Sequence, residues 1–503
     1  MRRVADIIAR DPETDVRDAL RIEAPAWSRI DSIITAALLI AAAATRFFNL
    51  GKPTAVVFDE VFSLGVAHNL LQHQPFRNTH PPLPGEVIAL SIKLFGDNPW
   101  SWRVANAGIG TALVAITYLL GRRMFNSRLA GAMAAGFVLC DGLFMVDSRL
   151  ALWEIFYLTS AAVAYLMLFR FAQGTDPFSR RRSLMWMGVA LGLGLGSKLG
   201  IPIVTMVLTI GAALLVVVGS AGGGDAAAND RRAIPYREMS SILALVGGLS
   251  GLLYLAVFWP NYWFGWWRGI GDQIVYYQAE FRFQVTAFHG NPHHYASRWW
   301  SWPLMLRPMR YYVPDEFVVS PTGAFPSIRA IGNPVLWWGA LMAMVLTARR
   351  TITRRSAARA FLVAGYLLYM VMWIPIGRFQ FIYYYMPALY LGFLALAAML
   401  AECWEGATRK WEQGALLIAA SPALILGLGT IIGAGAIAAI AIAYAALLRT
   451  RERDTGKMVC ALYLAGALIL FVYFLPLWVG LPLTPQQLAG RMWFRGPGLP
   501  NWL

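Results

Sequence analysis

The chain contains 503 residues, of which 58% are hydrophobic and only 14% are charged. Soluble domains carry about 25% charged residues, so the composition excludes an ordinary soluble protein and predicts an all-α polytopic membrane protein. The formal net charge is +16, but the arginines gather in short clusters between apolar stretches, as at Arg122–Arg123, Arg180–Arg182 and Arg449–Arg453. Such clusters indicate membrane topology, and we therefore expect no nucleic-acid partner.

Apolar length and the arginine clusters together predict thirteen membrane spans. We place them at about 30–48, 103–121, 129–146, 151–171, 184–197, 200–219, 240–259, 334–348, 358–375 and 384–402, with two more in the run 415–447 and a last one at 458–476. Residues 1–29 are expected to form a cytoplasmic segment that is not a cleaved signal, because mixed charges precede the first span.

Three regions follow this N-terminal segment. We expect residues 30–260 to form a first transmembrane module with an external loop at 51–100. Residues 261–333 form a long external loop rich in tryptophan and tyrosine, and residues 334–503 form a second module with an external tail. The unusual polar motifs all fall on the side opposite the arginine clusters, so we expect a catalytic or binding face outside, where membrane lipids meet water.

Two adjacent carboxylates, Asp59 and Glu60, lie in the apolar run AVVFDEVFSLG of the first external loop. Partial desolvation raises the proton affinity of a carboxylate, which can then take a proton from a hydroxyl nucleophile. We therefore predict that the pair is catalytic, and a solvated pair at the mouth of a loop is the alternative. The pair could also coordinate a divalent cation, and this alternative stays open, although proton abstraction explains the pair with fewer ligands.

The stretch NTHPPLPGEVIALSIKLFG, residues 78–96, predicts a turn followed by an amphipathic helix on the membrane surface. Its prolines fix the backbone and prevent an earlier helix start. His80 in this turn could point toward the carboxylates or toward a substrate, and an ordinary turn or capping role is the alternative.

Basic residues recur at the same outer side. Arg149 and Glu154 lie five residues apart, an offset that does not place them on one helical face, so we expect them to have different partners. Arg149 offers a planar fork suited to phosphate, with snorkelling toward lipid headgroups as the alternative. Lys198 and Arg378 end or begin other spans on this side, and together these cations could hold the phosphate of a lipid.

The segment HGNPHHYASRWWSWPLMLRPMRYYV, residues 289–313, combines aromatic and polar side chains. Its rings suit an interfacial loop or stacking on sugars, and we expect Trp302 and Arg307 within it to bind substrate, together with His80 and Glu154. The histidines of this segment raise the alternative of a metal site, but no acidic ligand is spaced with them, so we predict none. They are His289, His293 and His294.

A series of motifs, taken in chain order, resembles those of the protein O-mannosyltransferases, which are integral-membrane glycosyltransferases of the GT-C fold. The motifs are FDE at 58–60, HPP at 80–82, Phe95–Gly96 with Trp102–Arg103, SR…E from Ser148 to Glu154, SKLG at 197–200, WSWPLMLRP at 300–308, GNPVLWW at 332–338 and RFQFIYYYMP at 378–387. The likeness extends from about residue 30 to 503 and is closest to the shorter bacterial members.

The resemblance implies a GT-C fold with amphipathic helices in the first external loop. It also implies transfer of mannose, with inversion, from a polyprenyl-phosphate carrier to Ser or Thr hydroxyls of exported proteins, at the outer face of a bacterial cytoplasmic membrane. Asp59 is then the general base and Arg149 lies near the donor phosphate. Phosphate is already a competent leaving group, so arginine or lysine could stabilise its developing charge.

The chain departs from the family pattern at specific positions. Gly85 stands where the family usually has a lysine after HPP, Glu154 stands where it commonly has aspartate, and thirteen spans exceed the usual eleven. Thirteen spans are also typical of the related aminoarabinose transferases, so a lipid or polysaccharide acceptor is an alternative. A transporter of lipid-linked sugars is a third hypothesis, but the chain shows no internal repeat and its motifs gather at one face.

Overall fold

The computed structural model of this chain describes residues 25–75, 80–221, 236–286, 293–314, 323–354, 356–431, 449, 452–495 and 500–502. Four predicted features lie wholly or largely outside these residues: the N-terminal segment, the loop at 220–239, His289 and the second half of the 415–447 hairpin.

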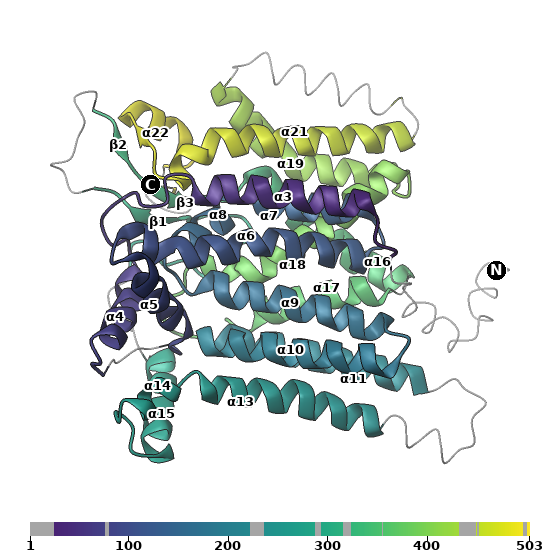
Figure 1. Ribbon diagram of the computed structural model, residues 1–503. Coiled ribbons are helices and arrows are strands. Elements are labelled where there is room, and N and C mark those ends of the chain that lie inside the picture. The colour runs from purple at the N-terminus through teal and green to yellow at the C-terminus, as the bar shows by residue number, and fades with distance from the viewer. Residues whose placement is uncertain are drawn as a thin grey trace.

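Long helices that run side by side make up most of the fold (Figure 1). They are α3 (Arg29–Phe47), α6 (Pro99–Met124), α7 (Arg128–Leu139) with α8 (Gly142–Arg149), α9 (Glu154–Gln173), α10 (Pro177–Ser197), α11 (Gly200–Ala221), η1 (Leu243–Gly248) with α13 (Leu249–Ala256), α16 (Pro334–Arg354), α17 (Ala357–Val371), α18 (Met386–Glu405), α19 (Lys410–Ile431) and α21 (Glu452–Trp478).

Short elements gather at one end of these helices, which we call the loop end (Figure 1). They are α4 (Glu60–Leu71), α5 (Leu83–Phe95), α14 (Trp259–Trp263), α15 (Ile270–Thr286), η2 (Trp299–Ser301), η3 (Ile382–Tyr385), α22 (Pro485–Arg491) and the strands β1 (Met309–Tyr312), β2 (Phe325–Pro326), β3 (Ile328–Ala330) and β4 (Pro482–Leu483). The predicted loop 261–333 is therefore largely folded, with β1 pairing antiparallel to β3.

The structure is that of a multi-pass membrane protein. Within the described part of the chain, seven helices are long and apolar enough to cross a membrane, or eight if the bent pair α7–α8 is one span. Helices α10, α16, α17 and α19 run alongside them in Figure 1 without meeting that criterion. The exact number of spans, eleven or thirteen, stays a prediction.

One predicted span is wrong in its geometry. We expected a continuous helix at 129–146 and a turn at Asp147–Arg149, but the chain bends by 61° between α7 and α8, and Arg149 is still helical. The Asp141 side chain causes the break, because its Oδ1 accepts hydrogen bonds from the amides of Leu143 and Phe144 and so caps a new helix. Its Oδ2 accepts from Trp337 Nε1 at 2.7 Å, which ties the bend to α16.

Helix α18 is the centre of the fold. The span Ile382–Glu405 is 89% buried and packs against α7, α16, α17 and α21, whereas α3 and the span Tyr236–Ala256 are each only 17% buried. Ile40 and Leu252 on these outer helices are exposed apolar side chains, as contact with lipid requires.

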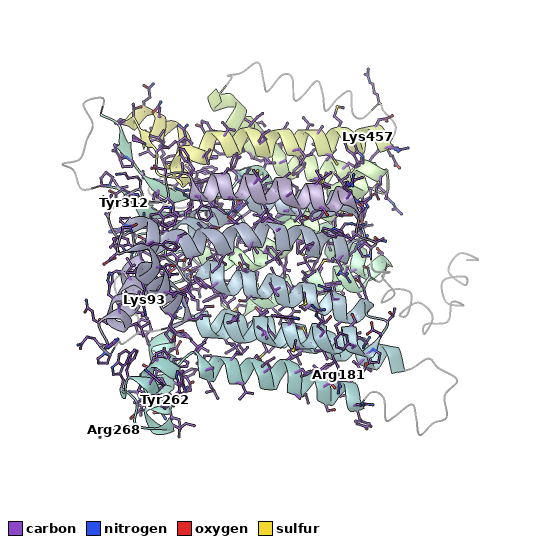
Figure 2. The ribbon with its side chains drawn as sticks, in the orientation of Figure 1. Lys93, Arg181, Tyr262, Arg268, Tyr312 and Lys457 are labelled. Carbon is purple, nitrogen blue, oxygen red and sulfur yellow. The ribbon has the colours of Figure 1, made fainter. Side chains whose placement is uncertain are left out.

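The two ends of the bundle carry different side chains. Figure 2 shows Lys93, Tyr262, Arg268 and Tyr312 at the loop end, and Arg181 and Lys457 toward the opposite end. We call the latter the arginine end, because the clusters at Arg122–Arg123, Arg180–Arg182 and Arg349–Arg350 all lie there. Every predicted polar motif that the structure describes is thus at the loop end.

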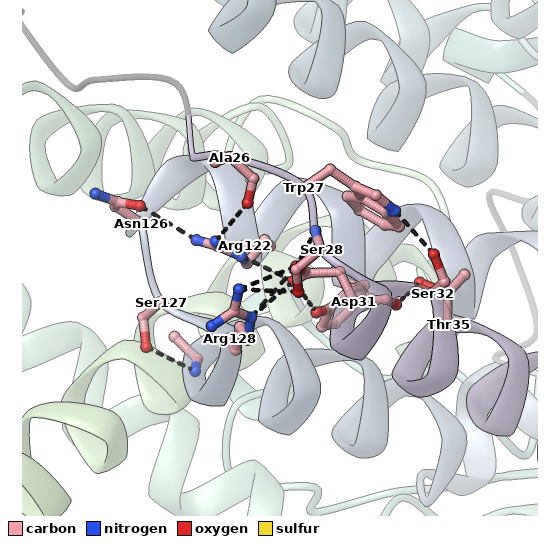
Figure 3. Close-up of polar contacts among 12 residues, drawn as sticks. Ala26, Trp27, Ser28, Asp31, Ser32, Thr35, Arg122, Asn126, Ser127 and Arg128 are labelled. Atoms are coloured by element: carbon pink, nitrogen blue, oxygen red, sulfur yellow. Dashed lines mark hydrogen bonds and ion pairs between the residues drawn. The ribbon is translucent and has the colours of Figure 1, made fainter.

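A buried carboxylate holds the arginine end together (Figure 3). Asp31 in the first turn of α3 is fully buried and accepts hydrogen bonds from Tyr118, Arg122 and Arg128, with the Tyr118 hydroxyl at 2.7 Å. Ser28 caps the same helix and donates from its amide to Asp31 at 2.9 Å. The saturated carboxylate fixes α3 against α6 and α7, which sets where the other end of α3 lies.

Candidate active site

Asp59 stands at the start of α4, at the loop end. The preceding turn is tight, because the Glu60 amide donates to the Val57 carbonyl at 3.0 Å. Asp59 is half-buried, and its side chain makes no capping hydrogen bond to the helix that it precedes. Its carboxylate therefore remains available for other chemistry.

The surroundings of Asp59 favour a proton acceptor that works near neutral pH. Burial, together with the nearby Glu154 carboxylate, raises the pKa of Asp59 to about 7, and the Lys198 ammonium partly offsets this rise. A general base is most effective when its pKa lies near the working pH. The structure thus brings Asp59, Glu154 and Lys198 together from three separate motifs.

Glu60 is placed differently from its neighbour. It is fully buried, and both of its oxygens face Arg103 of α6 in a bidentate ion pair, with Nε–Oε1 at 2.7 Å and Nη2–Oε2 at 2.8 Å. Oε2 also accepts from the Val57 amide, and Oε1 accepts from the Ala151 amide. These bonds occupy both oxygens of Glu60 and tie it to Arg103 and to two backbone amides, whereas the sequence predicts a catalytic role for it.

Arg103 anchors the whole turn before Asp59. Beyond Glu60, its Nη1 donates to the Pro53 carbonyl at 2.7 Å and its Nη2 donates to the Ala55 carbonyl at 3.0 Å. Asn98 and Pro99 start α6 one turn earlier, with the Asn98 side chain accepting from the amide of Ser101. This helix start fixes where Arg103 points.

Glu154 and Lys198 form a buried ion pair beside Asp59. Lys198 Nζ lies 2.6 Å from Glu154 Oε1, and the two side chains are 8% and 4% exposed. Glu154 is the first residue of α9, and Lys198 lies between α10 and α11. The ammonium keeps further hydrogen-bonding capacity, because it has three donors and the pair uses one of them.

The rings of Tyr383 and Tyr384 lie close to the Lys198 ammonium. Lys198 Nζ lies 5.0 Å from the Tyr384 ring centre and 5.7 Å from that of Tyr383. Arg378 contacts the same tyrosines, because its Nη2 donates to the Tyr384 hydroxyl at 3.1 Å. Tyr384 therefore links the two predicted phosphate-binding cations.

Trp302 packs against Tyr384 in the protein interior. Its ring is fully buried against Trp373 and Tyr384, and its indole N–H donates to Ser297 Oγ at 3.0 Å. The ring is enclosed by protein side chains, whereas stacking on a sugar, as the sequence predicts for Trp302, needs an open ring face. Trp302 instead supports Tyr384.

His80 lies in the turn before α5, as predicted. Its ring contacts Trp153 edge to face at 4.8 Å, and its carbonyl accepts from the Tyr276 hydroxyl of α15 at 3.0 Å. Burial, with the nearby positive charges of Lys198 and Arg378, holds the pKa of His80 well below its usual range. The ring is therefore neutral at physiological pH, next to the two cations.

Arg149 has a structural partner of its own. Its Nη1 donates to the carbonyls of Thr45, Arg46 and Phe48 at 3.0, 2.8 and 2.7 Å. These carbonyls end α3, where helix acceptors lack partners and attract cations. The prediction that Arg149 and Glu154 have different partners is confirmed, but the contacts of Arg149 are with a helix end, unlike those expected near a donor phosphate.

The sequence interpretation missed Arg103 and Asp147 as site residues. Asp147 in α8 is fully buried, and its carboxylate faces the Tyr311 hydroxyl without a hydrogen bond of ordinary geometry to any described residue. It lies close enough to Glu154 and Lys198 for their charges to act on it. A charged residue at the edge of a predicted apolar span was the available signal for both.

Arg307 and His293 are two further described residues that the sequence singled out. Arg307 is half-buried between η2 and β1, and its Nε has no hydrogen-bond partner in the described part of the chain. The His293 ring packs on Phe381 at 5.2 Å. Across the described ranges, three or more His, Cys, Asp or Glu side chains nowhere gather closely enough to hold a metal ion.

Gly85 explains one departure from the family pattern. A Cβ added there would lie 2.4 Å from Val66 Cγ1 and 2.6 Å from Val66 Cβ. The position faces α4 at a close helix–helix contact and has no room for a side chain. A lysine at 85 therefore could not reach the cluster around Lys198.

Comparison with known families covers nearly the whole chain. Residues 36–264 match a model described as dolichyl-phosphate-mannose-protein mannosyltransferase. Residues 273–497 match a model described as the C-terminal four-transmembrane region of protein O-mannosyltransferase.

Curated relatives extend over the same length. A polyprenol-phosphate-mannose–protein mannosyltransferase of Mycolicibacterium smegmatis is 26% identical, with 93% of this chain and 92% of the relative covered. The protein of the same name from Corynebacterium glutamicum is 22% identical, with 95% and 94% covered.

Solved structures share the fold. The S. cerevisiae protein O-mannosyltransferase Pmt1–Pmt2 complex bound to the sugar donor superposes with a TM-score of 0.74 at 14% identity, covering 97% of this chain and 94% of that chain. ArnT from Cupriavidus metallidurans bound to undecaprenyl phosphate gives 0.55 at 16% identity, covering 92% and 77%. The predicted GT-C fold is confirmed, and with matching family models in both halves, this chain belongs to the protein O-mannosyltransferase family.

Proposed function

We propose that this protein transfers mannose from a polyprenyl-phosphate carrier to Ser or Thr hydroxyls of exported proteins. The observation that carries the proposal is the free Asp59 carboxylate beside the buried Glu154–Lys198 pair, with its pKa raised to about 7. The names of the full-length relatives support the donor and the acceptor class.

The transfer step needs one base and one leaving group. Asp59 takes the proton from the acceptor hydroxyl as its oxygen attacks the anomeric carbon. The bond between that carbon and the phosphate oxygen breaks, and polyprenyl phosphate leaves with the electron pair. A single displacement inverts the anomeric configuration.

Cations stabilise the leaving phosphate. Lys198 has donors left after pairing with Glu154, and Arg378 is joined to it through Tyr384. Preorganised charges aimed at a developing negative charge are worth several kcal/mol in a site shielded from water. The neutral His80 ring beside these cations can donate a hydrogen bond to the substrate without adding charge.

Glu60 supports the transfer step by holding the turn that carries Asp59. Its bonds to Arg103 and to the amides of Val57 and Ala151 fix the turn that presents Asp59. We assign Glu60 and Arg103 the role of positioning residues, and Asp59 that of the catalytic base.

An apolar groove supports a lipid donor. It has a volume of about 740 Å³, lies toward the arginine end, and is lined by side chains of α9, α11, α16 and α17, among them Phe169, Leu208 and Phe361. Of these helices, α9, α11 and α17 lead to Glu154, Lys198 and the segment that carries Arg378. Leu168 lies about 21 Å along α9 from Glu154 at 1.5 Å per residue, so a long isoprenoid chain could extend from the site into this groove.

The arginine clusters support an orientation for this reaction. Arginine-rich ends of membrane proteins face the cytoplasm, so the loop end, with Asp59, would face outward from a bacterial cytoplasmic membrane. The N-terminus would then be cytoplasmic. Exported proteins would meet the site at the outer surface.

The test uses membranes that carry the full chain. Incubated with radiolabelled polyprenyl-phosphate-mannose and a Ser/Thr-rich peptide, the wild type should label the peptide, and Asp59→Asn should reduce the rate by about 10²- to 10⁴-fold. Equal transfer by both would remove Asp59 as the base. Label in the extracted lipid and none in the peptide would instead favour a lipid acceptor.

A further inference from the structure

The residue before Asp59 has an unusual backbone. Phe58 has a φ of +47°, in the left-handed region that bulky residues rarely adopt. Such a conformation is unfavourable for a bulky residue and persists only where the surroundings enforce it. Because Phe58 is bonded directly to Asp59, its backbone sets the direction in which the Asp59 side chain leaves the chain.

Tyr311 is the main aromatic contact of Phe58. The two rings meet edge to face with their centres 5.3 Å apart, and His293 makes a more distant contact at 6.5 Å. Tyr311 belongs to β1, more than two hundred residues away in sequence. The strained turn in the first module is thus braced by a strand from the segment 261–333.

The strand itself is irregular at this residue. Met309 and Arg310 pair with Ala330 and Arg329, but Tyr312 pairs with Ile328, and the register shifts between Arg310 and Tyr312. Tyr311 is the residue at this irregularity. Bulges of this kind redirect a side chain and are common next to active sites.

Tyr311 is held mainly by its ring. The side chain is 6% exposed, and its hydroxyl faces the buried Asp147 carboxylate without a hydrogen bond of ordinary geometry to any described residue. Burial, with the nearby carboxylates of Asp147, Glu154 and Asp59, holds the pKa of Tyr311 well above its usual value. The ring therefore stays neutral and closes the protein side of the carboxylate cluster.

We propose that Tyr311 is a positioning residue for the transfer reaction, which keeps Phe58 in its left-handed conformation and thereby directs and shields the Asp59 carboxylate. The proposal rests on the proposed role of Asp59. Without the Tyr311 ring, Phe58 relaxes toward an ordinary conformation, Asp59 turns from the cluster around Lys198, and water reaches its carboxylate.

Three variants separate the ring from the hydroxyl. Tyr311→Ala should lower kcat at least 50-fold with the donor KM changed less than about threefold, whereas Tyr311→Phe, which keeps the ring, should stay within threefold of the wild type. Tyr262→Ala, at the same end of the molecule in α14, is the matched control and should also stay within threefold. Folding of each variant is checked by its elution and melting temperature in detergent.

The pH profile gives a readout that a loss of folding would not produce. With Asp59 hydrated, the acidic limb of kcat/KM in Tyr311→Ala should move by about one pH unit or more to lower pH. An unshifted limb would contradict shielding of Asp59 by Tyr311.

Coupling to Phe58 is the decisive test. In a Phe58→Gly background the left-handed backbone costs nothing and the ring contact is gone, so adding Tyr311→Ala should change kcat less than about threefold. Additive losses would overturn the proposal, as would a loss in Tyr311→Phe equal to that in Tyr311→Ala. Full activity of Asp59→Asn in the same assay would instead remove Asp59 as the base, and wild-type protein that labels no peptide would reject the proposed function, which distinguishes these failures from a failure of the Tyr311 proposal.

Discussion

Lys198 Nζ lies 2.6 Å from Oε1 of Glu154, and the pair is nearly enclosed by protein. The two residues are 44 positions apart in the chain. A buried ion pair is held by its geometry, and the loss of one partner leaves an uncompensated charge. The pair therefore contributes to the stability of the fold at the loop end and also holds the positive charge that Lys198 offers to a phosphate.

Lys198→Met should damage both stability and transfer. The unpaired Glu154 carboxylate should cost about 3–5 kcal/mol, measured as a lower melting temperature in detergent, and donor turnover should fall strongly. In the double variant Lys198→Met with Glu154→Gln, much of the stability should return while activity stays low. Recovery of activity in the double variant would show that Lys198 serves the fold alone.

The activity should depend on pH through Asp59. Its pKa is raised to about 7, and a general base works only when deprotonated, so kcat/KM should fall about tenfold per pH unit below 7 and level off above it. The measurement is the initial rate of peptide labelling at low substrate from pH 5 to 9.

Glu86 provides the control for this assignment, because burial also raises the pKa of its carboxyl, to about 8. Glu86→Gln should leave the acidic limb where it is. A limb that disappears in this variant would assign the titration to Glu86 and contradict the role of Asp59.

Glu60→Gln should reduce activity by disturbing the turn. The amide keeps the shape but breaks the bidentate pair with Arg103, so we expect a loss of about 3 kcal/mol in stability and a lower kcat. Arg103→Lys should behave similarly, because an ammonium cannot reproduce the fork that serves Glu60, Pro53 and Ala55. Unchanged melting temperatures in both variants would show that this network does not fix the turn.

Gly85→Ala should destabilise the contact between α4 and α5. The added methyl would overlap Val66, and overpacking of this kind costs about 1–3 kcal/mol, more than the helix propensity gained. Thermal unfolding measures the effect. The companion Gly65→Ala, on α4 where nothing lies within 4 Å of an added Cβ, should be tolerated, and equal losses in both would contradict the packing argument.

Local patterns predicted a large part of this structure. Apolar length and arginine clusters predicted the helices and the single polar end, because both follow from the physics of each segment in lipid. The prolines at 81–84 predicted a turn followed by a helix, and α5 begins at Leu83. The offset between Arg149 and Glu154 predicted their separate partners. The order of the motifs also indicated the family, since each motif is a local string of residues.

The different roles of the site residues could not be predicted from local patterns. Asp59 and Glu60 are neighbours with the same chemistry, and they differ because Arg103, 43 residues after Glu60, saturates one and leaves the other free. Arg149 is engaged by the end of α3, and Trp302 is enclosed by Trp373 and Tyr384. In each case a partner distant in the chain sets the hydrogen bonds and the burial of the residue, and no local pattern of residues encodes which distant groups will meet.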